Sequence, residues 1–391
     1  MKSFIGRALT TACAAVVMLS GSAFAGGITV SAEKSYEAFY IESDDLISEI
    51  SSTVSENVPQ ITKPKASKGL SRDFIRVSWG ASKNSRVYKY VVQRRIPKNG
   101  WQTVATLPNM VNSYDDYVKN PGQTKKYEYR VRCKYVSGNR IKTSPGSTAG
   151  TVYGWLKLGI TLDPGHYLGC NNNFAQWGYG GSYRYAEGTQ MLKLGHYLKA
   201  ELEKNNVDVK ITRDFDLSAD RFAPGVRNEK YDARLYNSLV TRGNYAAGTD
   251  FFISLHTNAV SHWAETNNWG IQCFPNDLCM SNSASLKLAA DLGQTASDNI
   301  TPGGISISRR IPFNKSLTTW SRSGVISYHL NGKIYYTVLW GAEEVGVPGI
   351  LLEHSYHTNP AVRAWLLSDA NLKKLAKAEC RTILRNYGYT S

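Results

Sequence analysis

Apolar and charged positions alternate most regularly between residues 127 and 135. Five apolar side chains alternate there with four charged ones, in the order Tyr127, Glu128, Tyr129, Arg130, Val131, Arg132, Cys133, Lys134 and Tyr135. This period of two predicts a strand with one face in a core and one in solvent. Similar short strands are predicted at 74–79, 87–95, 101–106 and 140–143, with Gly-containing turns between them. Together they predict an all-β sandwich of seven strands over residues 60–153.

Two aromatic residues give this segment a more specific character. Trp79 ends the second predicted strand, and Tyr127 lies where a sandwich has its tyrosine corner. With the third strand YKYVVQRR and the Tyr-x-Tyr-Arg-Val-Arg of the sixth, the segment resembles a fibronectin type III domain. The resemblance implies the fold of about 90 residues and says almost nothing about function.

Residues 154–391 follow a different pattern. Short, continuously apolar strands are predicted at 158–162, 207–212, 251–255 and 349–352, and they alternate with helices predicted at 187–205, 231–247, 283–299 and 371–386. Apolar strands separated by helices are typical of strands buried on both sides. We therefore expect an α/β catalytic domain with a mostly parallel sheet covered by helices on both faces.

The first 59 residues are read as two segments without a core. Lys2 and Arg7 precede an apolar run at 8–19 and a small-x-small site at 23–25, which predicts a secretory signal peptide over residues 1–25. The apolar run is too short to span a membrane, and no later stretch is long and apolar enough. Residues 26–59 are rich in Ser and Glu and are predicted to be a linker or pro-segment. The mature protein is thus expected to be secreted, without a transmembrane segment.

Composition excludes wholesale disorder and a disulfide scaffold. Hydrophobic residues make up 42% of the 391 residues and charged residues 20%, as in globular proteins. Five cysteines remain after the predicted cleavage, too few and too scattered for a disulfide framework. Cys273 and Cys279 are close enough in sequence to close a hairpin.

The net charge of +15 is concentrated in one segment. Residues 60–150 contain 19 Lys or Arg against 4 Asp or Glu, whereas residues 151–391 contain 24 against 20. A basic module of this kind is expected to bind a polyanion, such as nucleic acid, anionic lipid or an anionic wall polymer. Because the chain is predicted to be exported, nucleic acid is not an expected partner.

Three predicted strands end in residues that carry chemistry. The first ends in DPGH with His166, the third in SLHTNA with His256, and the last in LLEHSYHTN with Glu353. The carboxyl ends of parallel strands meet at one edge of a sheet, so these side chains are expected to gather there. A catalytic zinc ion takes three protein ligands and leaves one position open, and two His with a carboxylate form one standard set.

Glu187 is the candidate for the carboxylate ligand. It is the only acidic residue between Asp163 and Glu201, and it opens the helix that follows the first strand. The alternative is that Glu187 is only a first-turn carboxylate favoured by the helix dipole. The five remaining histidines are expected not to bind metal: His196, His262, His329, His354 and His357. Of these, His354 and His357 are candidates for substrate contact.

Glu353 is the candidate general base. It follows a run, 349–352, that is expected to be buried, where a carboxylate is costly unless it is paired or has a function. A hydrolytic zinc site needs a group that takes a proton from water and returns it to the leaving amine. The alternative is a structural carboxylate that holds a loop. Glu343 and Glu344 are weaker candidates in a more exposed helix.

Residues 158–387 resemble the zinc-dependent N-acetylmuramoyl-L-alanine amidases of the type 3 family. The matching pieces are ITLDPGH, the helix led by Glu, VKITRDFD, R-x-x-x-A before DFFISLHTNA, and PGILLEHSYHTN. The resemblance implies a Zn²⁺ ion held by His166, Glu187 and His256, with Glu353 as the catalytic residue. The chain departs from the family in its long segment 167–186, in Ala246-Ala247, and in the inserts 263–279 and 300–334.

The resemblance also implies a reaction and a location. The expected reaction is hydrolysis of the peptidoglycan amide between N-acetylmuramic acid and L-alanine, by a water that zinc activates and Glu353 deprotonates. The chain is then expected to be associated with the bacterial cell wall, and the basic middle segment to bind anionic wall polymers. Two alternatives remain open: a zinc peptidase that cuts within the peptidoglycan stem peptide, and a non-catalytic wall-binding or adhesion protein.

Overall fold

The computed structural model describes residues 58–145, 150–166, 185–214, 233–260, 265–305, 317–320, 325–330 and 333–389. The predicted signal peptide lies outside these residues, and so do the linker up to residue 57 and most of the long segment that follows His166. Among the described helices, none is both long enough and apolar enough to cross a membrane.

The strands of the first segment form two sheets. The three-stranded sheet has the order β1 (Thr62–Ala66), β2 (Phe74–Gly80), β5 (Ser113–Tyr117). The other has the order β4 (Gln102–Pro108), β3 (Val87–Arg95), β6 (Lys126–Ser137), β7 (Arg140–Thr143), and β8 (Val152–Trp155) also pairs with β6. Eight strands therefore stand where the sequence predicts seven. The sequence pattern did not reveal β1, which contains a proline, or β5, which is SYDDY and lacks an apolar alternation.

The alternation along β6 is confirmed. Its five apolar side chains are buried, while the Arg and Lys side chains between them are partly exposed. Glu128 is the exception, because its buried carboxylate pairs with Arg95. Trp79 is buried with its ring 5.4 Å from that of Tyr90, and so joins β2 of one sheet to β3 of the other. The hydroxyl of Tyr127 donates to the carbonyl of Thr124, 3.2 Å away.

The second part of the chain builds an eight-stranded sheet. Its order is β10 (Asp208–Ile211), β9 (Gly159–Pro164), β11 (Phe251–Asn258), β16 (Gly349–Tyr356), β12 (Gln272–Pro275), β14 (Val325–Leu330), β13 (Leu317–Trp320), and β15 (Lys333–Ile334) pairs with β14. The first four strands are parallel, as predicted. From β12 onwards the sheet is mixed, since β12 runs antiparallel to β16 but parallel to β14, and β13 runs antiparallel to β14. To run parallel to β11, β12 would need a crossover connection, which is usually a helix. The described residues between β11 and β12 contain no helix.

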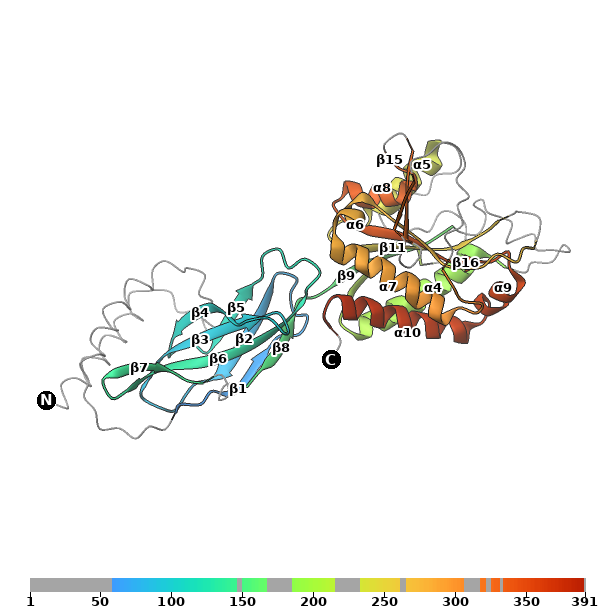
Figure 1. Ribbon diagram of the computed structural model, residues 1–391. Helices are drawn as coiled ribbons and strands as arrows, with labels where there is room; N and C mark the ends of the chain where they lie inside the picture. The colour runs from blue at the N-terminus through green and yellow to red at the C-terminus, as the bar shows by residue number, and fades with distance from the viewer. Residues whose placement is uncertain are drawn as a thin grey trace. The chain divides into compact units, whose positions relative to one another are not determined.

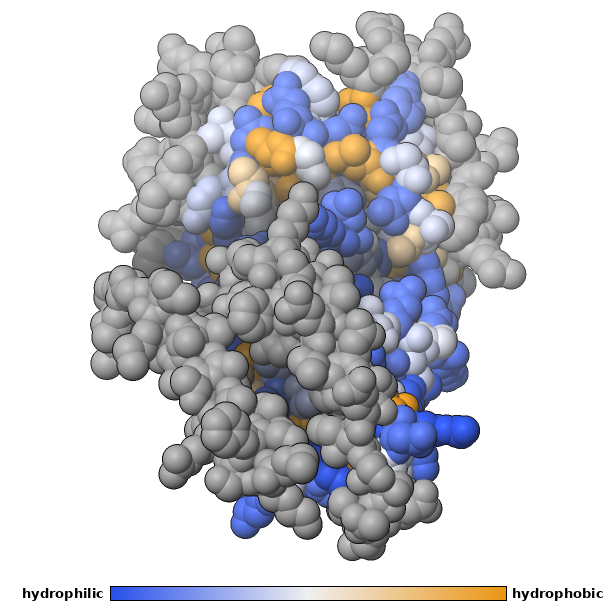
Figure 2. Space-filling view, turned by 90° about the vertical axis from the view of Figure 1, so that its left-hand side faces the viewer, coloured by the Kyte–Doolittle hydropathy of each residue, from blue (hydrophilic) through white to orange (hydrophobic). Residues whose placement is uncertain are grey.

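Helices cover both faces of this sheet (Figure 1). One face packs against α4 (Glu187–Lys204), α7 (Ser283–Asn299) and α10 (Asp369–Asn386), and the other against α5 (Ala233–Asn244) and α8 (Thr337–Glu344). Along β16, Ile350 and Leu352 belong to the first core while Leu351 belongs to the second. Two short helices, α6 (Asp277–Ser281) and α9 (Pro360–Leu366), complete the described part of this region. On the face that Figure 2 shows, hydrophilic residues predominate and the hydrophobic ones gather in its upper part.

The four described cysteines are all free and buried: Cys133, Cys273, Cys279 and Cys380. The suggested hairpin disulfide between Cys273 and Cys279 is therefore wrong. Cys273 lies on β12 and Cys279 on the following helix α6, and both pack in the same apolar core. Burial raises the pKa of the Cys273 thiol well above its usual value, so the group is neutral and behaves as a small apolar side chain.

Candidate metal centre

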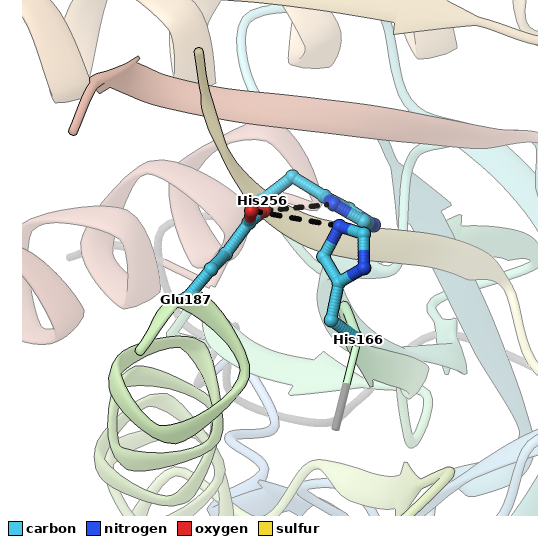
Figure 3. A group of neighbouring side chains, drawn as sticks. All are labelled: His166, Glu187 and His256. Carbon is cyan, nitrogen blue, oxygen red and sulfur yellow. Dashed lines mark hydrogen bonds and ion pairs between the residues drawn. The ribbon is translucent and has the colours of Figure 1, made fainter. Parts of the chain in front are cut away.

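The three predicted ligands lie together although they are up to 90 positions apart in the sequence (Figure 3). His166 follows β9, Glu187 is the first residue of α4, and His256 lies near the end of β11. Since β9 and β11 are adjacent and parallel, their carboxyl ends deliver both imidazoles to the same edge of the sheet. The helix that returns from this edge brings the carboxylate. Within the described residues, this is the group of His, Cys, Asp and Glu side chains that is able to hold a metal ion.

The spacing of the donor atoms fits one small metal ion. Oε2 of Glu187 lies 3.5 Å from Nε2 of His166, and Oε1 lies 3.1 Å from Nδ1 of His256. One ligand atom from each residue can be chosen so that all three lie within 4.8 Å of one another. Zinc–ligand bonds of about 2.0–2.2 Å in a tetrahedron place neighbouring ligand atoms about 3.3 Å apart. The two shorter contacts are close to this spacing, and the set of two His and one Glu is one that a small metal ion such as zinc can use.

The loop at His166 is shaped around the second histidine. A Cβ atom built on Gly165 lies 2.3 Å from Cε1 and 2.6 Å from Nδ1 of His256. Only glycine thus lets the imidazole of His256 lie against this backbone. His166 itself has φ of 51°, a left-handed conformation that is uncommon outside glycine and is found at functional sites.

The charge state of Glu187 suits a metal ligand. Its side chain is 2% exposed. Burial on its own raises the pKa of a carboxyl group, but His166 and His256 outweigh this effect and lower the pKa of Glu187 to about 2. The backbone N–H of Thr257 also donates to Oε1 at 2.9 Å and holds the carboxylate in place. The group is therefore ionised at neutral pH and can act as a ligand without first losing a proton.

Glu353 lies on the strand next to the one that carries His256. The two residues are paired in the parallel register of β11 and β16. Glu353 is 9% exposed, and its Oε2 atom has no hydrogen-bond partner among the described residues. Burial, followed by the charge of Glu187, raises the pKa of Glu353 well above its usual value. One oxygen of this buried carboxyl group is therefore not held by a hydrogen bond from the described residues.

A buried ion pair supports the loop that bears His166. Arg242 of α5 donates from Nε and Nη2 to the two carboxylate oxygens of Asp163, each at 2.8 Å. The same carboxylate accepts from the hydroxyls of Thr212 and Ser254, at 2.6 and 2.7 Å. Asp163, the residue before Pro164 in the DPGH sequence, thus joins β9 to both neighbouring strands and to α5. This network was not predicted, although the Arg of R-x-x-x-A is part of it.

Arg213 connects the backbone segments that carry two of the predicted ligands, and the sequence analysis did not predict this role. It is 1% exposed and donates to the carbonyls of Pro164 and Gly165 at 3.1 and 3.0 Å. It also donates to the carbonyl of Gly188, in the first turn of the helix that Glu187 opens. One guanidinium therefore ties the loop of His166 to the start of α4. An Arg directly after an apolar strand, in VKITRDFD, was the available signal, but its partners are backbone atoms that leave no mark in the sequence.

Two histidines expected near substrate are buried instead. His354 is fully buried, and His357 is 1% exposed with Nδ1 2.9 Å from the hydroxyl of Thr257. The same hydroxyl lies 3.1 Å from that of Tyr185, whose ring stacks on His357 with centroids 5.0 Å apart. Both histidines are therefore buried next to this sheet edge, and their burial does not support the prediction that they contact substrate.

Comparison with known families identifies the second part of the chain. The model of the N-acetylmuramoyl-L-alanine amidase family matches residues 160–385, more than half of the sequence. The chain belongs to this family. The match includes all four predicted site residues, and the family implies peptidoglycan as the substrate. A comparison of the chain with curated proteins found no match.

Several solved structures are similar to parts of the chain. Cwp6 from Clostridium difficile has 18% identity and a TM-score of 0.42, over 64% of this chain and 32% of Cwp6. The amidase AmiC2 of Nostoc punctiforme has 22% identity and a TM-score of 0.36, over 58% and 96% of the two chains. An Fn3-like protein from Clostridium thermocellum has 19% identity and a TM-score of 0.21, over 26% of this chain and 95% of that one. These scores are too low to carry an argument, so the fibronectin type III assignment stays a prediction.

Proposed function

We propose that the chain is a zinc-dependent hydrolase that cleaves the amide between N-acetylmuramic acid and L-alanine in peptidoglycan. The observation that carries the proposal is the convergence of His166, Glu187 and His256 beside the buried carboxyl of Glu353, within a member of the amidase family. When bound, zinc supplies a Lewis acid that polarises the amide carbonyl and lowers the pKa of water to about 7.

The side chains of this site divide the work. His166, Glu187 and His256 would hold the metal ion, as the three protein ligands that a catalytic zinc ion takes. Glu353 accepts a proton from the attacking water and returns it to the amine of the leaving stem peptide. The raised pKa of Glu353, caused by burial and then by the charge of Glu187, suits a group that must both accept and return a proton near neutral pH.

Product analysis tests the bond assignment. Purified peptidoglycan is digested with the zinc-loaded chain, and the soluble and insoluble products are identified by mass spectrometry and by their free amino ends. We expect stem peptides that begin with L-alanine and glycan strands whose lactyl groups are free. Cuts within the stem peptide would instead favour the zinc peptidase, and intact peptidoglycan would favour the non-catalytic wall-binding or adhesion protein.

We also propose that the chain is exported and comprises a fibronectin type III-like domain at 60–153 and a catalytic domain at 154–391. The basic and apolar start of residues 1–25 supports export. The bond from Tyr127 to the carbonyl of Thr124 supports the sandwich, since tyrosine corners bond to backbone a few residues upstream. Secretion from a bacterial host, followed by determination of the mature N-terminus, tests the first part. Cleavage after Ala25 is the expected result, and retention of residues 1–25 contradicts it.

A second proposed function is binding of an anionic wall polymer through a surface that we call the arginine patch. It comprises Arg95, Trp101, Arg130 and Arg132. The guanidinium groups of Arg95 and Arg130 lie over the ring of Trp101, 4.5 and 4.3 Å from its centroid. Partial burial, then the charges of Arg132 and Arg95, lower the pKa of Arg130. Glu128 offsets the charge of Arg95, and a polyphosphate chain would offset the neighbouring like charges of Arg130 and Arg132.

Charge reversal tests the arginine patch in the full chain. The variant Arg130→Glu/Arg132→Glu is compared with Lys63→Glu/Lys65→Glu, which changes the net charge equally on exposed residues of β1. Binding to immobilised poly(glycerol phosphate) is measured at low and high salt. We expect the patch variant to lose binding, the β1 variant to keep most of it, and salt to weaken what remains. Equal losses in both variants would show that net charge acts alone and that no patch exists.

A further inference from the structure

One peptide unit near the metal centre is held from both sides. It joins His256 to Thr257, and its N–H donates to Oε1 of Glu187 at 2.9 Å. Its carbonyl oxygen accepts from Nδ1 of His354 at 3.0 Å. This peptide therefore follows directly after the side chain of one metal ligand and contacts the carboxylate of another. Its orientation sets the positions of both.

The irregular end of β11 explains why a side chain serves this carbonyl. The register with β16 is regular up to the pair of His256 and Glu353, and the next pair is Asn258 with Tyr356. Two steps on β11 thus correspond to three on β16, where Ser355 has φ of 67°. Such bulges redirect backbone groups beside active sites. At this bulge the ring of His354 donates to the carbonyl of β11.

Glu379 holds the other side of the His354 ring. Its Oε1 atom, on α10, lies 2.8 Å from Nε2 of His354, and both side chains are fully buried. Their surroundings are the apolar core that contains Ile350 and Leu352 of β16 and Leu375 of α10. A carbonyl oxygen only accepts, so Nδ1 of His354 carries a proton. The hydrogen bond between Nε2 and the carboxyl group of Glu379 requires a second proton, shared between these two groups. A continuous path of hydrogen bonds then runs from Glu379 through the ring and the peptide to Glu187.

A contribution to folding stability does not by itself explain why His354 and Glu379 are buried together. Buried polar pairs pay a desolvation cost, and replacing them with apolar residues of similar volume is often neutral or stabilising. Partners one contact removed from a metal are a different matter, because they orient its ligands and commonly change metal affinity 10- to 100-fold. The arrangement of His354 and Glu379 has the form expected of such partners.

We propose that His354, oriented by Glu379, is a positioning residue of the metal centre. It fixes the peptide between His256 and Thr257 and thereby sets the spacing of His256 and Glu187. The inference rests on the proposed zinc site. Because His354 is fully buried, it acts through this peptide and makes no contact with substrate.

The test replaces the pair with apolar residues. His354→Leu/Glu379→Leu removes the hydrogen bonds without stranding a buried charge. The control is His329→Leu/Asp277→Leu, a partly exposed pair with the same 2.8 Å contact that lies on β14 and α6. Thermal unfolding of the metal-free proteins establishes that they fold. Zinc affinity is then measured by chelator competition, and the ligand geometry by the visible absorption of the Co²⁺-loaded proteins.

We expect the core variant to fold like the wild type, to bind zinc about 10- to 100-fold more weakly, and to show an altered Co²⁺ spectrum. The β14 control should match the wild type in affinity and spectrum. Glu379→Gln should recover most of the affinity, since its amide oxygen still accepts from the ring, whereas Glu379→Leu should not. These single variants preserve the test if the double variant does not fold.

Two outcomes separate the failure of this inference from the failure of the proposed function. If the wild type binds and uses zinc, and the folded core variants have the same zinc affinity and Co²⁺ spectrum, the positioning role is wrong and the metal centre stands. If the wild type itself binds no zinc, the metal centre is wrong and the positioning role falls with it.

Discussion

Glu353 is the residue on which proton transfer depends in the proposed reaction. Glu353→Gln removes the base but none of the metal ligands. We expect a folded protein with normal zinc content whose hydrolysis of peptidoglycan is about 100- to 10,000-fold slower. Glu343→Gln, on α8, is the control and should retain activity. Near-normal turnover by the zinc-loaded Glu353→Gln protein would assign Glu353 to a structural role.

Glu187 distinguishes a ligand from a helix-terminal charge. A neutral amide is a poor zinc donor, so Glu187→Gln should lose most of its zinc on dialysis, as should His166→Ala and His256→Ala. A helix-dipole role alone predicts normal metal content and a stability loss of only about 0.3–1 kcal/mol. Metal analysis of the three dialysed variants decides between the two.

Gly165 lies against the ring of His256, a contact that the sequence pattern did not predict. A Cβ at this position overlaps the ring of His256, with 2.3 Å to its Cε1 atom. Gly165→Ala should displace the imidazole and weaken zinc binding while leaving the secondary structure unchanged. The control is Gly100→Ala, because a Cβ at Gly100 has no atom within 4 Å. Gly122→Ala is less suitable, because Gly122 has a positive φ that an alanine would strain. Zinc affinity equal to that of Gly100→Ala would mean that the loop yields without affecting the site.

The buried pair of Asp163 and Arg242 holds three strands and α5 together beneath the site. Arg242→Met leaves an unpaired buried carboxylate and should cost about 3–5 kcal/mol in the free energy of unfolding. Adding Asp163→Asn should recover part of this loss, because the uncompensated charge disappears. Denaturant unfolding of the single and double variants measures both effects. Additive losses would contradict a direct interaction between the two residues.

Acid should weaken the same pair in a defined direction. Burial raises the pKa of Asp163, but Arg242 and the hydroxyl donors outweigh this effect, so the pKa of the folded state lies below its ordinary value of 3.8. Unfolding then favours proton uptake, and the stabilisation that is present above pH 3.8 is lost as the pH falls. We expect the metal-free wild type to lose stability more steeply below about pH 4 than Asp163→Asn. Parallel pH profiles would contradict this assignment.

The strands and helices with strong patterns were predictable. Period-two alternation predicted β6, and continuous apolar runs predicted the parallel strands β9, β11 and β16. The reversal of direction at β12 was not predicted, because this four-residue strand, QCFP, is too short to show a period. Short strands of this kind are defined by their neighbours in the sheet, and a local sequence pattern does not contain that information.

The site divides in the same way. His166, His256 and Glu353 were predictable because strand ends converge, and Glu187 because few acidic residues compete with it. Arg213 was not predictable, since it acts on three backbone carbonyls. The burial of His354 was not predictable either, because its partner Glu379 lies 25 positions further along the chain, on a helix packed against the sheet.

The two parts of the chain differ in the physical basis of the functions proposed for them. Residues 160–385 match the amidase family, and the chemistry proposed for them rests on a few side chains at one sheet edge. The segment 60–150 that precedes them has a net charge of +15, equal to that of the whole chain, and its proposed polymer binding rests on electrostatics that salt weakens. Raising the salt concentration should therefore release the chain from walls while it leaves the cleavage of small soluble fragments unchanged.

Stoichiometric reconstitution with zinc tests the central claim most directly. Metal-free protein is titrated with Zn²⁺, and the release of L-alanine amino ends from purified peptidoglycan is measured at each step. The account predicts no release without metal, a rise in proportion to added zinc, and saturation at about one zinc per chain, as expected for a single three-ligand site. Full activity of the metal-free protein, or saturation with zinc and no release of these amino ends, would contradict it.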